Sequence, residues 1–451
     1  MTRRPLALAL LLALLPAAAS AEDLLQTYEL ARNNDTQLAI SEANRDISHE
    51  GRVQARAALL PQLSGRASLN RSYVETDGDW RSAGRSRSVG VDLGQTVFDL
   101  GAISNLRAQQ DLDVAAGLDL EAANHELITR TSAAYFNVLV AIETLAAAEA
   151  AEAALQKQFD FADKRLEVGL APITDVHEAR AQYDAARANT ILARNALEDA
   201  YQALAEITGR EVRQLRALPE DFQPEAPGGD ELDRWLATAF ENNPSLRAAE
   251  YAVSAAEHSV TTARAGHLPR LSLGASYGEG AVWDRPAGVP VQGTNGPEAQ
   301  VGLTLTVPIF AGGATQSQVR QALSRRDISQ QQFEQARRAL DRNTRNAYQT
   351  VVAGVSEIEA RRQALVSARS AYEASQVGLE VGTRTVVDVL INQQNLFNAE
   401  REYALARYNF LQNRLLLAQA AGTLGIDDVR EINGLLSVEA AMPETRVGND
   451  G

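Results

Sequence analysis

Residues 55–64 read ARAALLPQLS, and residues 263–272, found 208 positions later, read ARAGHLPRLS. Sequence repeats of about 20 to 50 residues indicate solenoids and propellers. A spacing this long indicates instead one structural unit that occurs twice. We therefore predict two structural repeats, at residues 22–225 and 226–440, and a C-terminal tail at 441–451.

The first 21 residues have the pattern of an export signal. Arg3 and Arg4 come before an apolar stretch from Leu6 to Leu15, and small residues follow at Ala19 to Ala21. This apolar stretch is too short to span a bilayer, which takes about 20 residues. We expect residues 1–21 to be removed, so that the mature chain acts outside the cytoplasm.

Composition narrows the class of protein further. Without the two signal arginines the chain carries 41 basic and 58 acidic residues, a formal charge of −17, which argues against a nucleic acid partner. The absence of cysteine excludes disulfides, thiolate metal sites and a lipid-bearing N-terminal cysteine. We expect the periplasm or outer membrane of a Gram-negative bacterium.

Long helices dominate the predicted secondary structure. In the first repeat we expect helices at residues 24–59, 102–168 and 173–208, and the second repeat has a long helix at 314–381. At about 1.5 Å per residue each long helix would measure about 100 Å. That length fits one continuous helix lying antiparallel to two half-length helices stacked end to end. Segments 210–230 and 423–440 would then lie near the middle of the long helices.

Small and apolar residues recur along both long helices with the spacing of a coiled-coil seam, which favours closely packed helices. They are Ala134, Val138, Ala141, Leu145 and Ala148, then Ala347, Val351, Gly354 and Ile358.

Each repeat also contains a pair of strands. Apolar and polar residues alternate at 88–98 and at 301–309. The first of these strands follows another strand at 62–73. Within each pair a polar loop lies between the two strands, at about 75–87 in the first pair and 281–299 in the second. Such alternation is typical of outer-membrane barrel strands, although a surface hairpin on a soluble domain would look alike. Four strands are too few to close a barrel, and open edges are not tolerated in lipid. If the strands span the membrane, several chains must assemble.

Five stretches resemble the TolC-type outer membrane factors, and the resemblance covers nearly the whole mature chain. They are LLPQL (59–63), HLPRL (267–271), VGLTLTVPIFAGG (301–313), RLEVGLAPITDVHEARAQYD (165–184) and GLEVGTRTVVDVL (378–390). The resemblance implies an α+β membrane protein, a homotrimer. Each chain would give four strands to a 12-stranded β-barrel in outer membrane lipid, continued by a long α-helical tunnel in the periplasm. It further implies drug efflux or type I protein secretion with a periplasmic adaptor (membrane fusion protein) and an inner-membrane ABC or RND pump.

The resemblance also implies where such a conduit is gated. Asp388 matches an aspartate that faces the lumen, where three copies would form an acidic ring that favours cations. Thr385 lies three residues earlier, so Asp388 also fits the start of a helix, and that alternative stays open. A second family aspartate is replaced by Ile391, so only one acidic ring is expected.

Arg384 matches a family arginine that links two helical hairpins in the closed state. Its implied partners are Thr174 and Asp175, whereas a local pair between Arg384 and Asp388 is the alternative. The implied docking points for the adaptor are the two turns between helices, and each turn glycine is alternatively a simple helix cap. These turns are Val168, Gly169 and Leu170, and Val381, Gly382 and Thr383.

Two other classes of protein are less consistent with this sequence. The five histidines show no metal-ligand spacing, and no nucleophile motif or phosphate loop is present, so we expect no enzyme, metal or cofactor. A soluble periplasmic coiled-coil adaptor or structural protein would explain the helices. It would not explain the duplicated strand pairs.

Overall fold

The fold is that of a computed structural model, which describes residues 22–440 except 77, 171, 220, 226–231 and 284–294. The predicted signal, the tail and most of the predicted loop at 281–299 lie outside this part. The chain forms two compact units, each drawn from both sequence repeats. The helical unit comprises Met1–Ile40, Glu121–Asn243 and Ala339–Gly451, and the strand unit comprises Ser41–Leu120 and Pro244–Arg338. The division into repeats itself stays an interpretation of the sequence.

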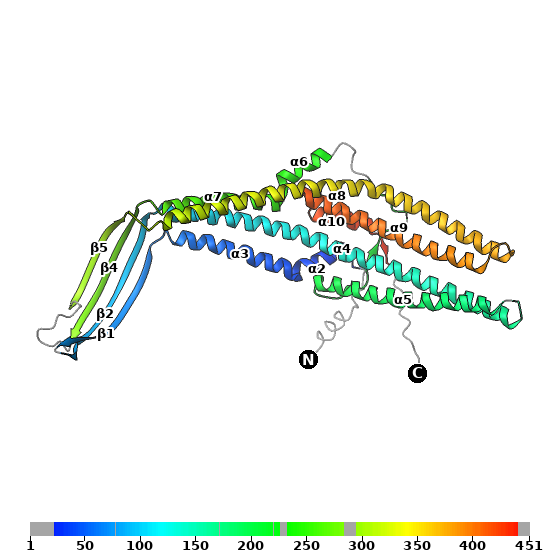
Figure 1. The fold of residues 1–451 in the computed structure, drawn as a ribbon, viewed down its shortest axis with the longest axis horizontal. Helices are drawn as coiled ribbons and strands as arrows, with labels where there is room; N and C mark the ends of the chain where they lie inside the picture. The colour runs from blue at the N-terminus through cyan, green and yellow to red at the C-terminus, as the bar shows by residue number, and fades with distance from the viewer. Residues whose placement is uncertain are drawn as a thin grey trace, which may run out of the picture. The chain divides into compact units, whose positions relative to one another are not determined.

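The strand unit contains one antiparallel four-stranded sheet in the order β1-β2-β4-β5 (Figure 1). Its strands are β1 (Gln62–Thr76), β2 (Asp79–Phe98), β4 (Arg270–Trp283) and β5 (Gly296–Thr306). The outermost strands, β1 and β5, each have a neighbour on one side only. The sheet is therefore open within one chain.

The sheet differs from the prediction in two places. The predicted loop at 75–87 is wrong, because β1 continues to Thr76 and β2 begins at Asp79. This part of β2 is polar, so it lacks the apolar alternation that marks a strand in a sequence. The strand predicted to reach Ile309 ends at Thr306, since Pro308 has no N–H for the ladder.

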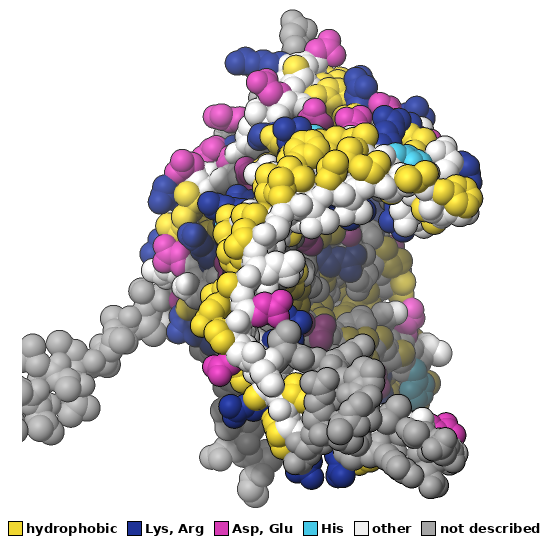
Figure 2. Space-filling view, turned by 90° about the vertical axis from the view of Figure 1, so that its left-hand side faces the viewer, with side chains coloured by type: hydrophobic (Ala, Val, Ile, Leu, Met, Phe, Trp, Pro, Cys, Tyr) yellow, Lys and Arg dark blue, Asp and Glu magenta, His cyan; other side chains and the backbone are white. Residues whose placement is uncertain are grey.

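The two faces of the sheet differ in chemistry. Because side chains alternate along a strand, the register assigns every residue to one face. The apolar face carries Leu63, Ala67, Leu69, Val89, Val91, Leu93, Leu273, Ala275, Tyr277, Val301, Leu303 and Leu305. The polar face carries Ser64, Arg66, Ser68, Asp92, Ser276 and Gln300. The space-filling view from the strand side shows hydrophobic side chains along the outside of an arch, with a hollow inside it (Figure 2).

Beyond the sheet, Ile309 and Phe310 are 95% and 88% exposed within the chain. Phe310 is therefore not a packed aromatic in the protomer, whereas its repeat counterpart Phe98 is about half exposed. Their exposure is consistent with contact to lipid or to another chain.

Long helices cross the division between the units. They are α4 (Leu100–Glu167) and α8 (Ala314–Glu380), and the shorter helices of the helical unit are α5 (Ile173–Thr208), α9 (Val386–Ala421) and α10 (Ile426–Leu435). Among the described residues, no helix is long and apolar enough to cross a membrane.

The helix predicted at 24–59 is two helices, α2 (Leu24–Asn34) and α3 (Thr36–Ala57). The break lies at the buried Asp35, whose Oδ1 accepts a hydrogen bond from the backbone N–H of Leu38 at 2.7 Å and forms an ion pair with Arg130 Nη2 at 2.7 Å. The second repeat has a matching break between α6 (Leu232–Asn242) and α7 (Pro244–Ala265). A carboxylate that caps a new helix competes with continuation of the old one.

The helix of each repeat that follows a turn ends against the first short helix of the same repeat, at the break inside the predicted half-length helix. Gly209 ends α5 with φ 74°, and a Cβ atom there would lie 2.9 Å from Cβ of Asn34 at the end of α2. Gly422 ends α9 with φ 72°, and its Cβ would lie 2.6 Å from the backbone of Asn242 at the end of α6. Only glycine combines this conformation with so close an approach.

A small sheet lies against the middle of α4, as predicted for segment 210–230. It pairs β3 (Arg216–Ala217) with β6 (Val438–Glu439). The hydroxyl of buried Tyr135 accepts a hydrogen bond from Arg216 N at 2.8 Å and donates one to Arg216 O at 2.9 Å. Burial raises the pKa of Tyr135, so this hydroxyl stays protonated.

Candidate functional site at the helix turns

The two turns predicted to matter have the same backbone geometry. After α4, Leu170 N donates to Arg165 O at 2.8 Å and Gly169 N donates to Leu166 O at 2.9 Å. After α8, Thr383 N donates to Gly378 O at 2.8 Å and Gly382 N donates to Leu379 O at 3.2 Å. Both are Schellman motifs, which require positive φ at the capping glycine; Gly169 has φ 74° and Gly382 has φ 79°. The helix-cap interpretation of these glycines is therefore confirmed.

The turns nevertheless expose apolar side chains, which a cap does not require. Val168, Leu170 and Val381 are 67%, 68% and 68% exposed within the chain. Ile173, in the first turn of α5, is also exposed. Exposed apolar residues gathered at one end of a helical hairpin indicate a contact surface for another molecule.

Apolar packing holds the two hairpins together behind the turns. Ala162 of α4 packs against Val176 and Ala179 of α5. Farther from the turn, Leu390 of α9 packs against Leu155 and Ala186 of the first hairpin. The α8–α9 turn is thereby positioned beside the α4–α5 turn.

A groove of about 720 Å³ opens between the two hairpins at this end. Its walls include both Arg384 and Asp175, the residues predicted to link the hairpins. No ion pair within 4.0 Å joins them in the described chain. The structure thus brings the predicted partners to one groove and leaves the predicted contact unmade within a protomer. Thr174 Oγ1 lies 3.5 Å from Asp175 Oδ1, next to the groove.

The position of Arg384 depends on Gly378, which the sequence analysis did not single out. The carbonyl of Gly378 accepts hydrogen bonds from the backbone N–H groups of Thr383 and Arg384. A Cβ at Gly378 would lie 2.6 Å from Cγ of Arg384. The signal for its role was a lone glycine in the last turn of a long helix.

Asp388 is the acidic residue of a capping box at the start of α9. Its Oδ2 accepts hydrogen bonds from Thr385 N at 2.9 Å and Thr385 Oγ1 at 2.8 Å, and its own N–H donates to Thr385 Oγ1 at 3.2 Å. The backbone and side-chain hydrogen bonds from Thr385 lower the pKa of Asp388, and the charge of Arg384 adds to this effect. The helix-start interpretation is thus confirmed, and the carboxylate stays charged. Ile391, one turn farther along, is exposed.

Away from the turns, the structure contains a largely buried charged cluster that the sequence analysis did not predict. Arg407 Nη2 of α9 lies 3.2 Å from Glu143 Oε1 of α4, and Tyr408 Oη donates to the same oxygen at 3.1 Å. Arg407 Nη1 donates to Pro219 O at 3.2 Å. The cluster ties the two hairpins together through polar contacts, and periodicity does not distinguish it from ordinary exposed charges. No group of three or more possible metal-ligating side chains occurs among the residues that the structure describes.

Comparison with known families decides the identity of the chain. The profile of the outer membrane efflux protein family matches residues 27–210 and 235–423. The chain belongs to this family. It is 36% identical over 444 residues to outer membrane protein TolC of Escherichia coli (strain K12), a match that covers 96% of this chain and 89% of that protein. It is 29% identical to the alkaline protease secretion protein AprF of Pseudomonas aeruginosa, covering 93% of this chain and 88% of AprF.

The fold agrees with that of a solved outer membrane channel. The CmeC outer membrane channel of Campylobacter jejuni has a TM-score of 0.78 and 20% identity, covering 92% of this chain and 90% of CmeC. The chain is thus an outer membrane channel of the type that serves efflux and secretion systems. The family is one of transport channels rather than enzymes.

Proposed function

We propose that this chain forms a homotrimeric conduit that is gated where its α4–α5 and α8–α9 turns meet. Three copies would supply the strands that an open four-stranded sheet needs in order to close in lipid. An inner-membrane pump would load cargo at the periplasmic end, and an adaptor would join the two proteins. The observation that carries this proposal is the groove that holds Arg384 and Asp175 between two hairpins.

The gate follows from the charges on the two walls of this groove. Arg384 and Asp175 carry opposite charges on different hairpins, so a small inward movement of one hairpin, or the arrival of another protomer, would pair them. Such a pair would favour the closed arrangement. An adaptor that binds the turns better in the open arrangement would shift the population toward it.

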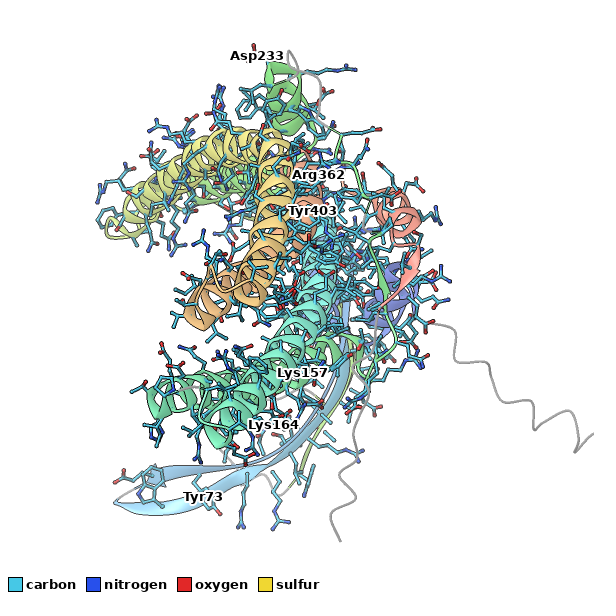
Figure 3. The ribbon with its side chains drawn as sticks, turned by 90° about the vertical axis from the view of Figure 1, so that its right-hand side faces the viewer. Tyr73, Lys157, Lys164, Asp233, Arg362 and Tyr403 are labelled. Carbon is cyan, nitrogen blue, oxygen red and sulfur yellow. The ribbon has the colours of Figure 1, made fainter. Side chains whose placement is uncertain are left out.

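Arg384→Ser should raise single-channel conductance in planar bilayers, because it removes the positive partner and leaves the closed arrangement less favoured. We expect a severalfold increase over the wild-type protein. Arg362→Ser is the matched control, since Arg362 is also exposed on the α8–α9 hairpin but pairs locally with Glu359 at 2.8 Å (Figure 3). Equal conductance of Arg384→Ser and wild type would remove Arg384 from the gate.

Asp388 has a separate role in this proposal, as the acidic ring of the conduit. In the same bilayers, Asp388→Asn should reduce the preference for K⁺ over Cl⁻. Because the pKa of Asp388 is lowered, the wild-type preference should persist as the pH falls from 7 to about 5, above the ordinary carboxyl range. A preference that Asp388→Asn leaves intact would show that Asp388 only caps α9.

Adaptor docking at the turns can be tested with the lysines of the chain. The sequence contains only two, Lys157 and Lys164, and both lie on α4 near its turn (Figure 3). An amine-reactive crosslinker added to cells that contain the adaptor should join it to the peptides bearing these lysines. Leu170→Asp should reduce the yield strongly, because it places a charge in the exposed apolar turn. An adaptor crosslinked equally to wild type and Leu170→Asp would place docking elsewhere.

A further inference from the structure

The apolar face of the sheet carries three arginines at one end. The register places Arg71 of β1 directly opposite Arg85 of β2, and Arg87 lies two residues farther along β2 on the same face. Toward the other end, this face carries Leu69, which pairs with Arg87, and then Val89, which pairs with Glu279. Three guanidinium groups are thus gathered at one end of an otherwise largely apolar face.

Strand geometry places these arginines at the edge of the apolar band. From Leu63 to Arg71 the strand covers about 27 Å at a rise of about 3.4 Å per residue. With a barrel tilt of about 40° this corresponds to about 21 Å of depth, close to the height of a lipid-facing band. A guanidinium in the hydrocarbon would be costly, whereas at the edge of the band it meets headgroups.

Aromatic side chains mark the same level. Tyr73 is exposed beside Arg71, whose Cζ lies 5.2 Å from its ring centre, and Trp283 is paired with Arg85 across the sheet (Figure 3). Aromatic girdles of this kind lie at the boundary between hydrocarbon and headgroups. The opposite ends of β1 and β2 join α3 and α4. Since those helices belong to the periplasmic side, the arginines lie at the outer leaflet.

We propose that Arg71, Arg85 and Arg87 bind the phosphate groups of the phosphorylated glycolipid that forms the outer leaflet. Guanidinium groups bind phosphate through paired, charge-assisted hydrogen bonds. The carboxylate of Glu279 lies diagonally from Arg87 on the same face. The proposal rests on the outer-membrane location of the sheet and is independent of the gate.

The test uses the purified full-length protein in detergent, titrated with bisphosphorylated lipid A and followed by native mass spectrometry. The variant with Arg71→Gln, Arg85→Gln and Arg87→Gln should bind about tenfold more weakly or worse than wild type. Arg87→Gln alone should weaken binding, whereas Arg66→Gln should not. Arg66 is the matched control because it lies on the polar face of the same hairpin, where it pairs with Asp92.

Two further binding experiments identify the ligand. Dephosphorylated lipid A should bind wild type and the triple variant equally weakly, and inorganic phosphate should not displace lipid A. Unchanged conductance in bilayers will show that the variants are folded, and the single variants replace the triple one if it fails to assemble. Equal affinity of wild type and variants, an equal loss in Arg66→Gln, or displacement by inorganic phosphate would each overturn the proposal.

Discussion

Glu143→Ala should destabilise the helical unit by about 3 kcal/mol, the lower end of the usual cost of removing one partner of a buried ion pair, because Glu143 is itself partly exposed. The side chain of Arg407 is only 7% exposed, and its guanidinium is held by Glu143 and by Pro219 O. Without the carboxylate, a positive charge remains in a place that water barely reaches. Tyr408 also loses the acceptor of its hydroxyl hydrogen bond. Because burial raises the pKa of Tyr408, this hydroxyl keeps its proton and is left as a donor without that acceptor.

Removing the other partner, by Arg407→Leu, should destabilise the helical unit less. The side chain of Glu143 is 34% exposed, so after Arg407→Leu its carboxylate can remain hydrated while leucine fills part of the buried space. The double variant that combines Glu143→Ala with Arg407→Leu should be more stable than Glu143→Ala alone, because it leaves no buried unpaired charge.

Thermal melting of the helical signal by circular dichroism will rank the three variants, with an expected fall of about 6 °C or more for Glu143→Ala. The explanation fails if Arg407→Leu melts below Glu143→Ala.

The parts of the fold that follow from local pattern were predictable. The duplicated segments, the turn glycines and the absence of proline within α4 led to helix bounds within about two residues of the structure. Gly209 and Gly422, which were expected to end their helices, do so with the same close contact in both repeats.

Features that depend on tertiary contacts were not predictable. The break at Asp35 requires Arg130, which is distant in sequence, to make a buried carboxylate favourable. The outer half of β2 is a strand because β1 pairs with it, although its own residues are polar. Likewise the groove between the turns is formed by residues of two hairpins that are distant in sequence, behind which Leu390 packs on the first hairpin.

The second prediction with a large effect concerns how the sheets of several protomers close into a barrel. Within one chain β1 and β5 are both edges, and the apolar face is exposed on all four strands. An open sheet in lipid would leave a row of backbone groups unpaired, at a cost of several kcal/mol for each group. We therefore expect β1 of one protomer to pair with β5 of the next.

Cysteine crosslinking between these edges tests this claim most directly, because the chain contains no cysteine of its own. Ala67→Cys on β1 would be combined, one at a time, with cysteines introduced at positions 298 to 304 on β5, and each variant oxidised in native membranes. Some positions should yield a covalent ladder of one, two and three chains that stops at three, while single-cysteine controls stay monomeric. A complete absence of crosslinks, or a ladder that continues beyond three chains, would contradict the closed trimeric barrel.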